Sequence, residues 1–274
     1  MPYLKWAGGK AAILPTLLPL ITNGQTWTSS SFYDLFCGAG TVAEAVAPLF
    51  KDIMLNDVNR DLAAAHRYTI NHGGYFIDLA KRQFCEGLNK EKSFLAQRAA
   101  FNNTATNMEK AALFIYLNKH CYNGLCRYNL KGIFNTPYGK YKRVTFPGDK
   151  MQAFHEALNK KAVVSSADFE VMAKLAMSGD VIYCDPPYWP LGGTADFTSY
   201  YAGGFTEDDQ RRLAAMAEQS EARVVISNHD LPETRELYKN ADQIVEIQAP
   251  RRIAANGSRG KVKELVAIYN GHGS

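Results

Sequence analysis

Short runs rich in valine, isoleucine and aromatic residues recur along the chain and alternate with stretches of helical periodicity. Seven such runs are predicted to be strands: Phe32–Phe36, Ile53–Asn56, Ala162–Ser165, Val181–Cys184, Val224–Ser227, Ile244–Gln248 and Leu265–Tyr269. Runs of this kind are typical of strands buried on both faces, and their alternation with helices predicts a mainly parallel α/β sheet.

One helix start is clearly marked. Thr206 can cap a helix, Asp209 stands three residues later, and acidic residues crowd the positive end of the helix dipole. Leu213, Met216 and Ala217 then recur at helical spacing. We therefore predict a helix that begins after Thr206.

The pattern changes between about Asn59 and Lys150, where strand-like runs are absent. Helical segments such as Met108–Lys119 replace them, followed by a stretch rich in glycine and proline. We predict that residues 59–148 form a helical domain, inserted into an α/β domain built from residues 1–58 and 149–274.

Basic residues are concentrated in two segments, although the net charge of the 274 residues is only +4. Residues 110–148 hold seven basic side chains and no acid, and residues 249–263 hold five and no acid. An acidic body with two basic segments predicts a polyanionic partner that is bound at defined places. Two solvated loops are the alternative.

Other features narrow the class of protein. No apolar run approaches the roughly 20 residues of a membrane helix, and the N-terminus lacks a signal-peptide pattern. The five cysteines are scattered and odd in number, which argues for reduced thiols. We expect a cytoplasmic protein that has no membrane partner and is a monomer in solution.

Two glycines follow the first predicted strand, in Phe36-Cys37-Gly38-Ala39-Gly40. Glycines at a strand-to-helix turn let a cofactor approach the backbone closely. Asp57 follows the second predicted strand, where a carboxylate can accept hydrogen bonds from ribose hydroxyls. Together they suggest an adenosine-containing cofactor, and the missing third glycine of the dinucleotide fingerprint argues against NAD. The alternative is that Asp57 only caps the next helix.

The most specific motif is Asp185-Pro186-Pro187-Tyr188, at the end of a predicted strand. Two prolines cannot continue a sheet, so they hold the chain in a bend at the carboxyl edge, where open α/β sheets bind ligands. A carboxylate, a backbone carbonyl and an aromatic ring fit a planar base with an exocyclic amino group. The ring stacks, and the two oxygens accept the N–H bonds and free the nitrogen lone pair to attack an electrophilic methyl group. A strand-ending proline turn is the alternative.

The N-terminal segment Lys5-Trp6-Ala7-Gly8-Gly9-Lys10 is a weaker signal. The two glycines open a turn, Trp6 can pack on an adenine or near a sulfonium, and Lys10 can reach a carboxylate. An ordinary N-terminal anchor fits this segment equally well.

In this order, the N-terminal segment, the glycine turn, the basic insertion and the Asp185 motif resemble the Dam family of DNA adenine-N6 methyltransferases. The resemblance covers nearly the whole chain, and Tyr122–Leu130, Phe134–Tyr141, Ile226–Asp230 and Asn256-Gly257 add to it. It implies a Rossmann-like class I methyltransferase sheet that binds S-adenosylmethionine and releases S-adenosylhomocysteine. It also implies that the inserted helical domain recognises double-stranded DNA.

The resemblance assigns roles to individual positions. The catalytic residues are expected to be Asp185, Pro186 and Tyr188. The expected cofactor-binding residues are Trp6, Lys10, Phe36, Gly38, Gly40, Asp57 and Asp185. The expected DNA-binding residues are Lys5, Tyr122, Asn123, Leu125, Arg127, Pro137 and Lys140.

The family's substrate is the duplex sequence GATC, whose adenine must be flipped out of the helix to reach the enzyme. The resemblance implies that Arg127 reads a guanine and that Tyr122 wedges into the base stack. Tyr128, on the other side of the glycine-bearing loop, is a second candidate for base contact. Roles in mismatch repair, DNA replication and restriction evasion fit this activity, as do bacterial and phage origins.

The chain departs from the family's pattern at three places. Lys140 stands where close relatives usually carry arginine, which turns a bidentate contact into a point-charge contact. Alanines replace a serine-rich counterpart within residues 249–257, and Trp189 follows the catalytic motif where a smaller residue is common.

Other functions stay open. They are an amino methyltransferase on RNA, cytosine-N4 or a protein amide, a non-catalytic DNA-binding relative, and a nicotinamide dehydrogenase. Asp185 argues against cytosine and amide substrates, and the intact motifs argue against a non-catalytic protein. No metal site is expected, because Cys121 and Cys126 lack the spacing of common zinc ligands.

Overall fold

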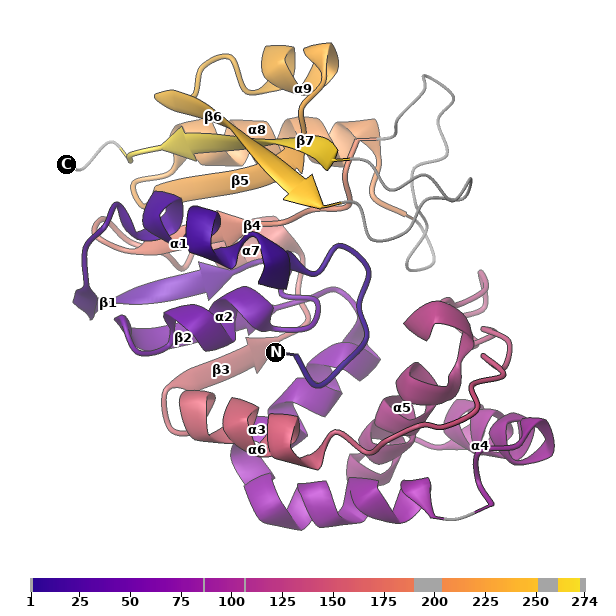
Figure 1. Ribbon diagram of the computed structural model, residues 1–274. Helices are drawn as coiled ribbons and strands as arrows, with labels where there is room; N and C mark the ends of the chain where they lie inside the picture. Colours follow the sequence, from indigo (N-terminus) through magenta and orange to yellow (C-terminus); the bar gives the residue numbers. More distant parts are fainter. Residues whose placement is uncertain (1, 86, 106, 190–203, 251–260, 272–274) are drawn as a thin grey trace.

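The computed structural model describes all of the chain except residues 1, 86, 106, 190–203, 251–260 and 272–274. Seven strands form one sheet in the order β3-β2-β1-β4-β5-β7-β6 (Figure 1). They are β1 (Trp27–Asp34), β2 (Phe50–Asn56), β3 (Ala162–Ser165), β4 (Val181–Cys184), β5 (Arg223–His229), β6 (Gln243–Pro250) and β7 (Lys261–Tyr269). Only β7 is antiparallel to its neighbours, so the predicted Rossmann-like, mainly parallel sheet is confirmed.

The bounds of β1 differ from the prediction. The strand begins at Trp27, because the polar residues 28–31 continue the pairing with β2, which is irregular between Trp27 and Ser31. It ends at Asp34, and Leu35 and Phe36 already belong to the turn that leaves the sheet.

Helices cover both faces of the sheet. Side chains alternate along each strand, so in β1 Phe32 packs with one buried cluster and Tyr33 with another on the opposite face. The first cluster receives side chains from α1 (Leu14–Thr22), α2 (Thr41–Val46), α3 (Arg60–Lys81) and α6 (Gly148–Leu158). The second receives them from α7 (Phe169–Ala173), α8 (Glu207–Gln219) and the end of α9 (Pro232–Leu237).

The predicted helix start at Thr206 is confirmed. The Thr206 side chain accepts a hydrogen bond from the Asp209 backbone N–H, and the Asp209 side chain accepts one from the Thr206 N–H. This reciprocal capping box fixes the first turn of α8 at the carboxyl edge of the sheet.

The segment between the second and third strands is helical, as predicted. It contains α3, α4 (Glu91–Asn103), α5 (Met108–His120) and the short 3₁₀ helices η2 (Arg82–Phe84) and η3 (Tyr122–Gly124). In Figure 1, α4 and α5 lie beside the sheet, and α3 connects them to it. The loop after α5 is held by two isolated bridges, Cys121 to Tyr138 and Tyr128 to Phe134. The division into two domains stays a prediction.

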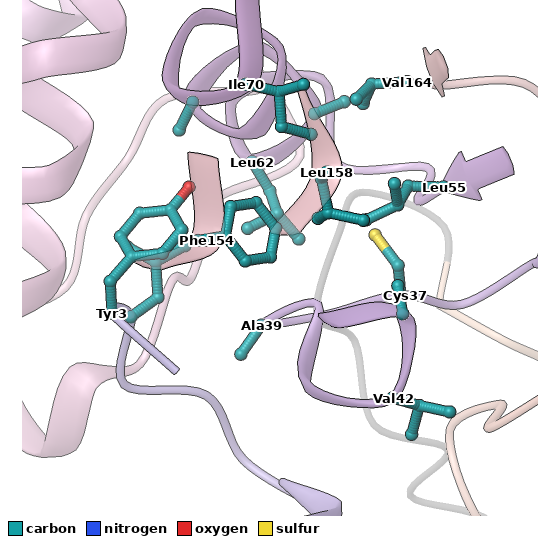
Figure 2. Close-up of a cluster of buried hydrophobic side chains, with 14 of the residues drawn as sticks. Tyr3, Cys37, Ala39, Val42, Leu55, Leu62, Ile70, Phe154, Leu158 and Val164 are labelled. Carbon is teal, nitrogen blue, oxygen red and sulfur yellow. The ribbon is translucent and has the colours of Figure 1, made fainter. Parts of the chain in front are cut away.

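A buried cluster packs against the turn after β1 (Figure 2). The ring of Phe154, from α6, lies between Tyr3 and Leu62 in this cluster. A Cβ built at Gly40 would lie 2.7 Å from that ring, and the φ of Gly40 is +71°, so only glycine fits without strain.

Among the residues that the structure describes, no helix is both long and apolar enough to cross a membrane.

Candidate active site

A cavity of about 630 Å³ opens at the carboxyl ends of β1, β2, β4 and β5. It lies where the strand order reverses, because β1 has β2 on one side and β4 on the other. Of the sequence-predicted catalytic and cofactor residues, those that line the cavity are Trp6, Lys10, Phe36, Gly38, Asp57, Asp185, Pro186 and Tyr188. Gly40 does not line it and lies over Phe154 instead.

The N-terminal segment contributes the cavity's ammonium group. Lys10, at the start of η1 (Lys10–Ala12), places its Nζ 2.8 Å from Asp185 Oδ1 and 3.0 Å from the Gly8 carbonyl oxygen. The same ammonium lies 4.7 Å from the centre of the Tyr188 ring. The expectation that Lys10 reaches a carboxylate is therefore confirmed, and the partner is the acid of the proline motif.

The glycine turn is tied to the segments around it. A Cβ at Gly38 would lie 2.7 Å from the Trp6 ring, so the indole packs directly on this backbone. The Gly38 N–H donates to Asp57 Oδ2 at 3.1 Å. The Gly38 carbonyl lies 2.7 Å from His66 Nε2, and His66 Nδ1 lies 2.8 Å from the Tyr3 hydroxyl. Because a carbonyl oxygen can only accept, the Nε2–H donates to Gly38, and Nδ1 of the neutral ring accepts from the Tyr3 hydroxyl.

Asp57 is not the cap of the following helix, so that alternative is wrong. Its Oδ1 accepts from the Asn59 N–H at 2.9 Å, and it is the Asn59 side chain that caps α3 by accepting from the Asp61 and Leu62 amides. Asp57 therefore bridges the glycine turn and the start of α3, and it also faces the cavity.

Tyr188 is held at both its hydroxyl and its ring. Its hydroxyl donates to Glu264 Oε2 at 2.9 Å, and the His229 ring contacts it edge-on at 4.8 Å between centroids. Burial, together with the charges of Asp185 and Glu264, raises the pKa of Tyr188 well above its usual value. The phenol therefore stays neutral and donates a hydrogen bond to Glu264.

Carboxyl groups outnumber ammonium groups in the lining of the cavity. Among the described residues, its lining holds one ammonium, that of Lys10, and five carboxyl groups: Asp34, Asp57, Asp168, Asp185 and Asp209. Burial raises the pKa of Asp57 to about 6. Burial also raises the pKa of Asp185, and the adjacent Lys10 opposes that rise. Such a cavity favours a cationic ligand over one that carries a pyrophosphate.

Sequence reasoning missed two polar groups that line this cavity. Asp34 Oδ1 and Thr41 Oγ1 are buried and have no hydrogen-bond partner among the described residues. Burial and the charges of Asp185 and Asp57 raise the pKa of Asp34 well above its usual value. The position of Asp34 at the end of β1, directly before the glycine turn, was a readable signal, because carboxyl ends of parallel strands meet at one edge.

Apart from Lys5, the predicted DNA-binding residues lie on the loops after α5. The Tyr122 N–H donates to the Pro137 carbonyl at 2.9 Å, so these two exposed residues are adjacent. Tyr122 is 52% exposed, and Asn123 and Lys140 are exposed with φ values of 52° and 54°. Leu125 is half-buried.

Arg127 and Lys5 are anchored in different ways. Arg127 is exposed, and its Nε donates to Asn135 Oδ1 at 2.8 Å, which orients the guanidinium. The backbone of Lys5 pairs with the buried Asn118 carboxamide through bonds of 2.9 and 2.7 Å. Its Nζ lies 3.7 Å from the centre of the Tyr141 ring. Lys5 therefore lies against the same loops, next to Trp6 of the cavity.

Tyr128 has partners within the protein, and the expected base contact by this residue stays a prediction. Its hydroxyl donates to Asp61 Oδ2 at 2.8 Å, and its ring packs edge-on against Phe134 at 5.6 Å. The tyrosine binds the loop to the start of α3 instead of facing outward. Sequence proximity to a glycine-bearing loop does not reveal a partner so far away in the chain.

The second basic segment lies mostly outside the described residues, as do Asn256 and Gly257 and most of the alanine-rich stretch. Within the residues that are described, no group of three or more histidine, cysteine or acidic side chains is arranged to hold a metal ion.

The chain is similar to known proteins over nearly its whole length. Residues 6–253 match the family model described as D12 class N6 adenine-specific DNA methyltransferase. The DNA adenine methylase of Vibrio cholerae is 38% identical over 275 residues, which cover 98% of this chain and 96% of that protein. The protein of the same name from Serratia marcescens is 38% identical, with 97% of each chain covered. That of Escherichia coli is 37% identical, with 97% of this chain and 94% of the relative covered.

Proposed function

Because this chain belongs to the D12 class of N6 adenine-specific DNA methyltransferases, we propose that it methylates adenine N6 in the duplex sequence GATC, with S-adenosylmethionine as the methyl donor. The observation that carries the proposal is that the Asp185 motif and the glycine turn line the same cavity. The groups that we propose to bind the base and the cofactor therefore line one cavity.

The charges and unpaired atoms of the cavity support this cofactor. S-adenosylmethionine carries an ammonium and a sulfonium, and when bound it supplies an electrophilic methyl group. The acid-rich lining suits these two cations, and Asp34 Oδ1 is a buried acceptor without a partner among the described residues. Trp6 on Gly38, together with Phe36, offers apolar contacts, and Asp57 offers a carboxylate for the ribose.

Asp185 and the Pro186 carbonyl are proposed to accept the two N–H bonds of the adenine amino group. An amino nitrogen attached to a purine is a poor nucleophile, because its lone pair is delocalised into the ring. Two acceptors hold its hydrogens aside and favour attack through that lone pair. The nitrogen then gains a methyl group and loses one proton, to water or to Asp185. Lys10 helps to keep Asp185 ionised before the step.

The target base must leave the double helix to reach this cavity, which costs a few kcal/mol of stacking and pairing. Stacking on Tyr188 offsets part of that cost in the pocket. The exposed Tyr122 is proposed to fill the gap in the base stack, and Arg127, oriented by Asn135, to read a guanine. Lys5, Asn123, Leu125, Pro137 and Lys140 complete the proposed DNA contact.

The proposal is tested with labelled S-adenosylmethionine and two DNA duplexes that differ by one base, one with GATC and one with GATT. We expect incorporation only into the GATC duplex. Asp185→Asn should lower the rate at least about 100-fold, because one acceptor is weakened at the reacting nitrogen. Asp208→Asn, at an exposed position in α8, is the matched control and should keep the wild-type rate.

The outcomes separate the alternatives. Methyl transfer to an RNA of the same sequence, but not to DNA, would indicate the other nucleic acid as the substrate. DNA binding without any transfer would indicate a non-catalytic relative. Full activity in Asp185→Asn would contradict the proposed mechanism.

A further inference from the structure

We infer that two buried carboxamides, those of Gln210 and Asn228, clamp the Asp185–Trp189 loop and so position its reacting groups for methyl transfer. We call this pair the carboxamide clamp. The inference rests on the proposed function and extends it to residues that do not line the cavity. Neither carboxamide is expected to touch the substrate, so both are positioning residues.

The loop needs such support because of its own sequence. Pro186 and Pro187 have no N–H group, so this part of the chain cannot be held by donating backbone hydrogen bonds. The strand β4 ends at Cys184, directly before Asp185. Beyond that point the orientation of the Pro186 carbonyl and of the Tyr188 ring depends on groups outside the loop.

Gln210 supplies one of these groups. Its Nε2 donates to the Pro187 carbonyl at 2.8 Å, and its side chain is completely buried. A carbonyl can only accept, so the NH2 side of this carboxamide must face the loop. This hydrogen bond holds the peptide group between Pro187 and Tyr188, one residue away from the carbonyl of Pro186.

Asn228, at the end of β5, supplies the second group. Its Oδ1 accepts from the Trp189 N–H at 3.0 Å and from the His229 N–H at 2.9 Å. Its Nδ2 donates to Gln210 Oε1 and to the Tyr238 hydroxyl, both at 3.1 Å. All four hydrogen-bonding positions of this carboxamide are used. Because the Gln210 NH2 group faces Pro187, its Oε1 faces Asn228, and the Asn228 side chain presents its NH2 group to that oxygen.

The residues of the carboxamide clamp are buried and held by hydrogen bonds of their own. Gln210, Asn228 and Tyr238 are each 0% exposed. Gln210 follows the capping box of α8, and its own N–H donates to the Thr206 carbonyl at 3.1 Å. A fully satisfied buried network specifies one arrangement, because breaking any bond leaves a buried polar group unpaired.

The sharpest test replaces Gln210 by an isostere that can be switched by pH. In Gln210→Glu, an ionised carboxylate faces the Pro187 carbonyl, and two acceptors repel each other. The protonated carboxyl group can donate to that carbonyl and restore the bond. We expect the single-turnover rate constant to fall about 10- to 100-fold at pH 9, with the KM values for DNA and cofactor little changed.

The rate of Gln210→Glu relative to wild type should then rise as the pH is lowered to 6. Gln210→Met, which has no donor at any pH, should be slow at both pH values. Gln219→Glu is the matched control, because it makes the same change at an exposed position of the same helix. It should behave like wild type throughout.

Hydrogen exchange gives a readout that does not depend on activity. Within residues 185–189 only Asp185, Tyr188 and Trp189 have amide protons. In Gln210→Glu at pH 9, exchange in this peptide should accelerate, and exchange in β4 should stay at the wild-type rate. A merely destabilised protein would show faster exchange in both.

The inference is overturned if both Gln210 variants keep the wild-type rate constant, or if loop exchange changes no more than exchange in β4. Absence of methyl transfer by the wild-type protein would instead contradict the proposed function. The exchange result would still decide whether the clamp holds the loop.

Discussion

The ammonium of Lys10 lies 2.8 Å from Asp185 Oδ1, and the two side chains are only 5% and 18% exposed. This pair joins the N-terminal segment to the proline motif across 175 residues of sequence. Burial raises the pKa of Asp185, and the positive charge of Lys10 lowers it again. The lysine thus favours the ionised acceptor that the proposed mechanism needs.

Removal of this charge should shift the pH dependence of methyl transfer. In Lys10→Met the pKa of Asp185 rises further, so the carboxylate is protonated at a higher pH. We expect the acid limb of kcat against pH to move upward, and kcat at pH 7 to fall about 10-fold or more. The measurement is kcat at saturating DNA and cofactor between pH 5.5 and 9.

Lys10→Arg is the control for that experiment, because it retains a positive charge beside the carboxylate. Its acid limb should stay close to that of the wild type. An unmoved limb in Lys10→Met would show that the lysine does not tune Asp185.

His66 should make folding stability depend on pH. Burial lowers the pKa of folded His66 to about 4, against about 6.5 in the unfolded chain. Below pH 6.5 the unfolded state therefore binds a proton that the folded state does not. The contribution of neutral His66 to the free energy of unfolding is therefore fully present above pH 6.5. It declines as the pH falls toward 4, by about 2 kcal/mol between pH 7 and pH 5.

Urea unfolding at pH 7 and pH 5 tests this expectation. Other groups titrate in the same range, so the comparison is between variants. His66→Gln should lose about 2 kcal/mol less than wild type on acidification. His72→Gln, at an exposed site, should show the wild-type change. Equal changes in all three proteins would contradict the assignment.

Gly40→Ala should destabilise the fold. The new Cβ would meet the Phe154 ring at 2.7 Å, and the φ of +71° is unfavourable for alanine. Overpacking and backbone strain together predict a loss of about 2–3 kcal/mol in the free energy of unfolding. Gly74→Ala, where nothing lies within 4 Å, is the control and should be neutral or slightly stabilising. Equal stability of the two variants would show that the contact relaxes without cost.

Native alkylation should modify a single cysteine. Cys85 is exposed, and the other four cysteines are buried. Iodoacetamide should therefore add one group per native chain and five after denaturation, as counted by mass spectrometry. In the native state, iodoacetamide should add no group to the Cys85→Ser variant. Rapid labelling of any second thiol in the native protein would contradict the burial described.

The sequence was sufficient to locate the sheet and the proline and glycine motifs. The central strands β4 and β5 are almost fully buried and appear as apolar runs, and a run was recognised within each of the seven strands. The motifs follow strands β1, β2 and β4, and parallel strands bring their carboxyl ends together. The convergence of Gly38, Asp57 and Asp185 on one cavity was therefore predictable before any coordinates. Their roles toward cofactor and base stay predictions.

The hydrogen-bond partners of these residues were harder to predict from the sequence. Gln210 stands three residues before Leu213 on the buried stripe of α8, which was a readable sign of a buried polar group. Its partner, the carbonyl of Pro187, lies 23 positions away in the chain. The bond of Tyr128 to Asp61 spans 67 positions and could not be predicted from the loop sequence around Tyr128.

The sequence by itself determined the α/β sheet, the helical segment between β2 and β3, and the chemical groups brought to the carboxyl edge. These follow from local periodicity and from short motifs whose residues are adjacent in the chain. Only the tertiary structure decided which carboxylate pairs with Lys10, which carboxamides hold the proline loop, and which aromatic rings face outward. A hydrogen bond needs two groups at about 3 Å, and for groups far apart in sequence the packing of the whole chain sets that distance.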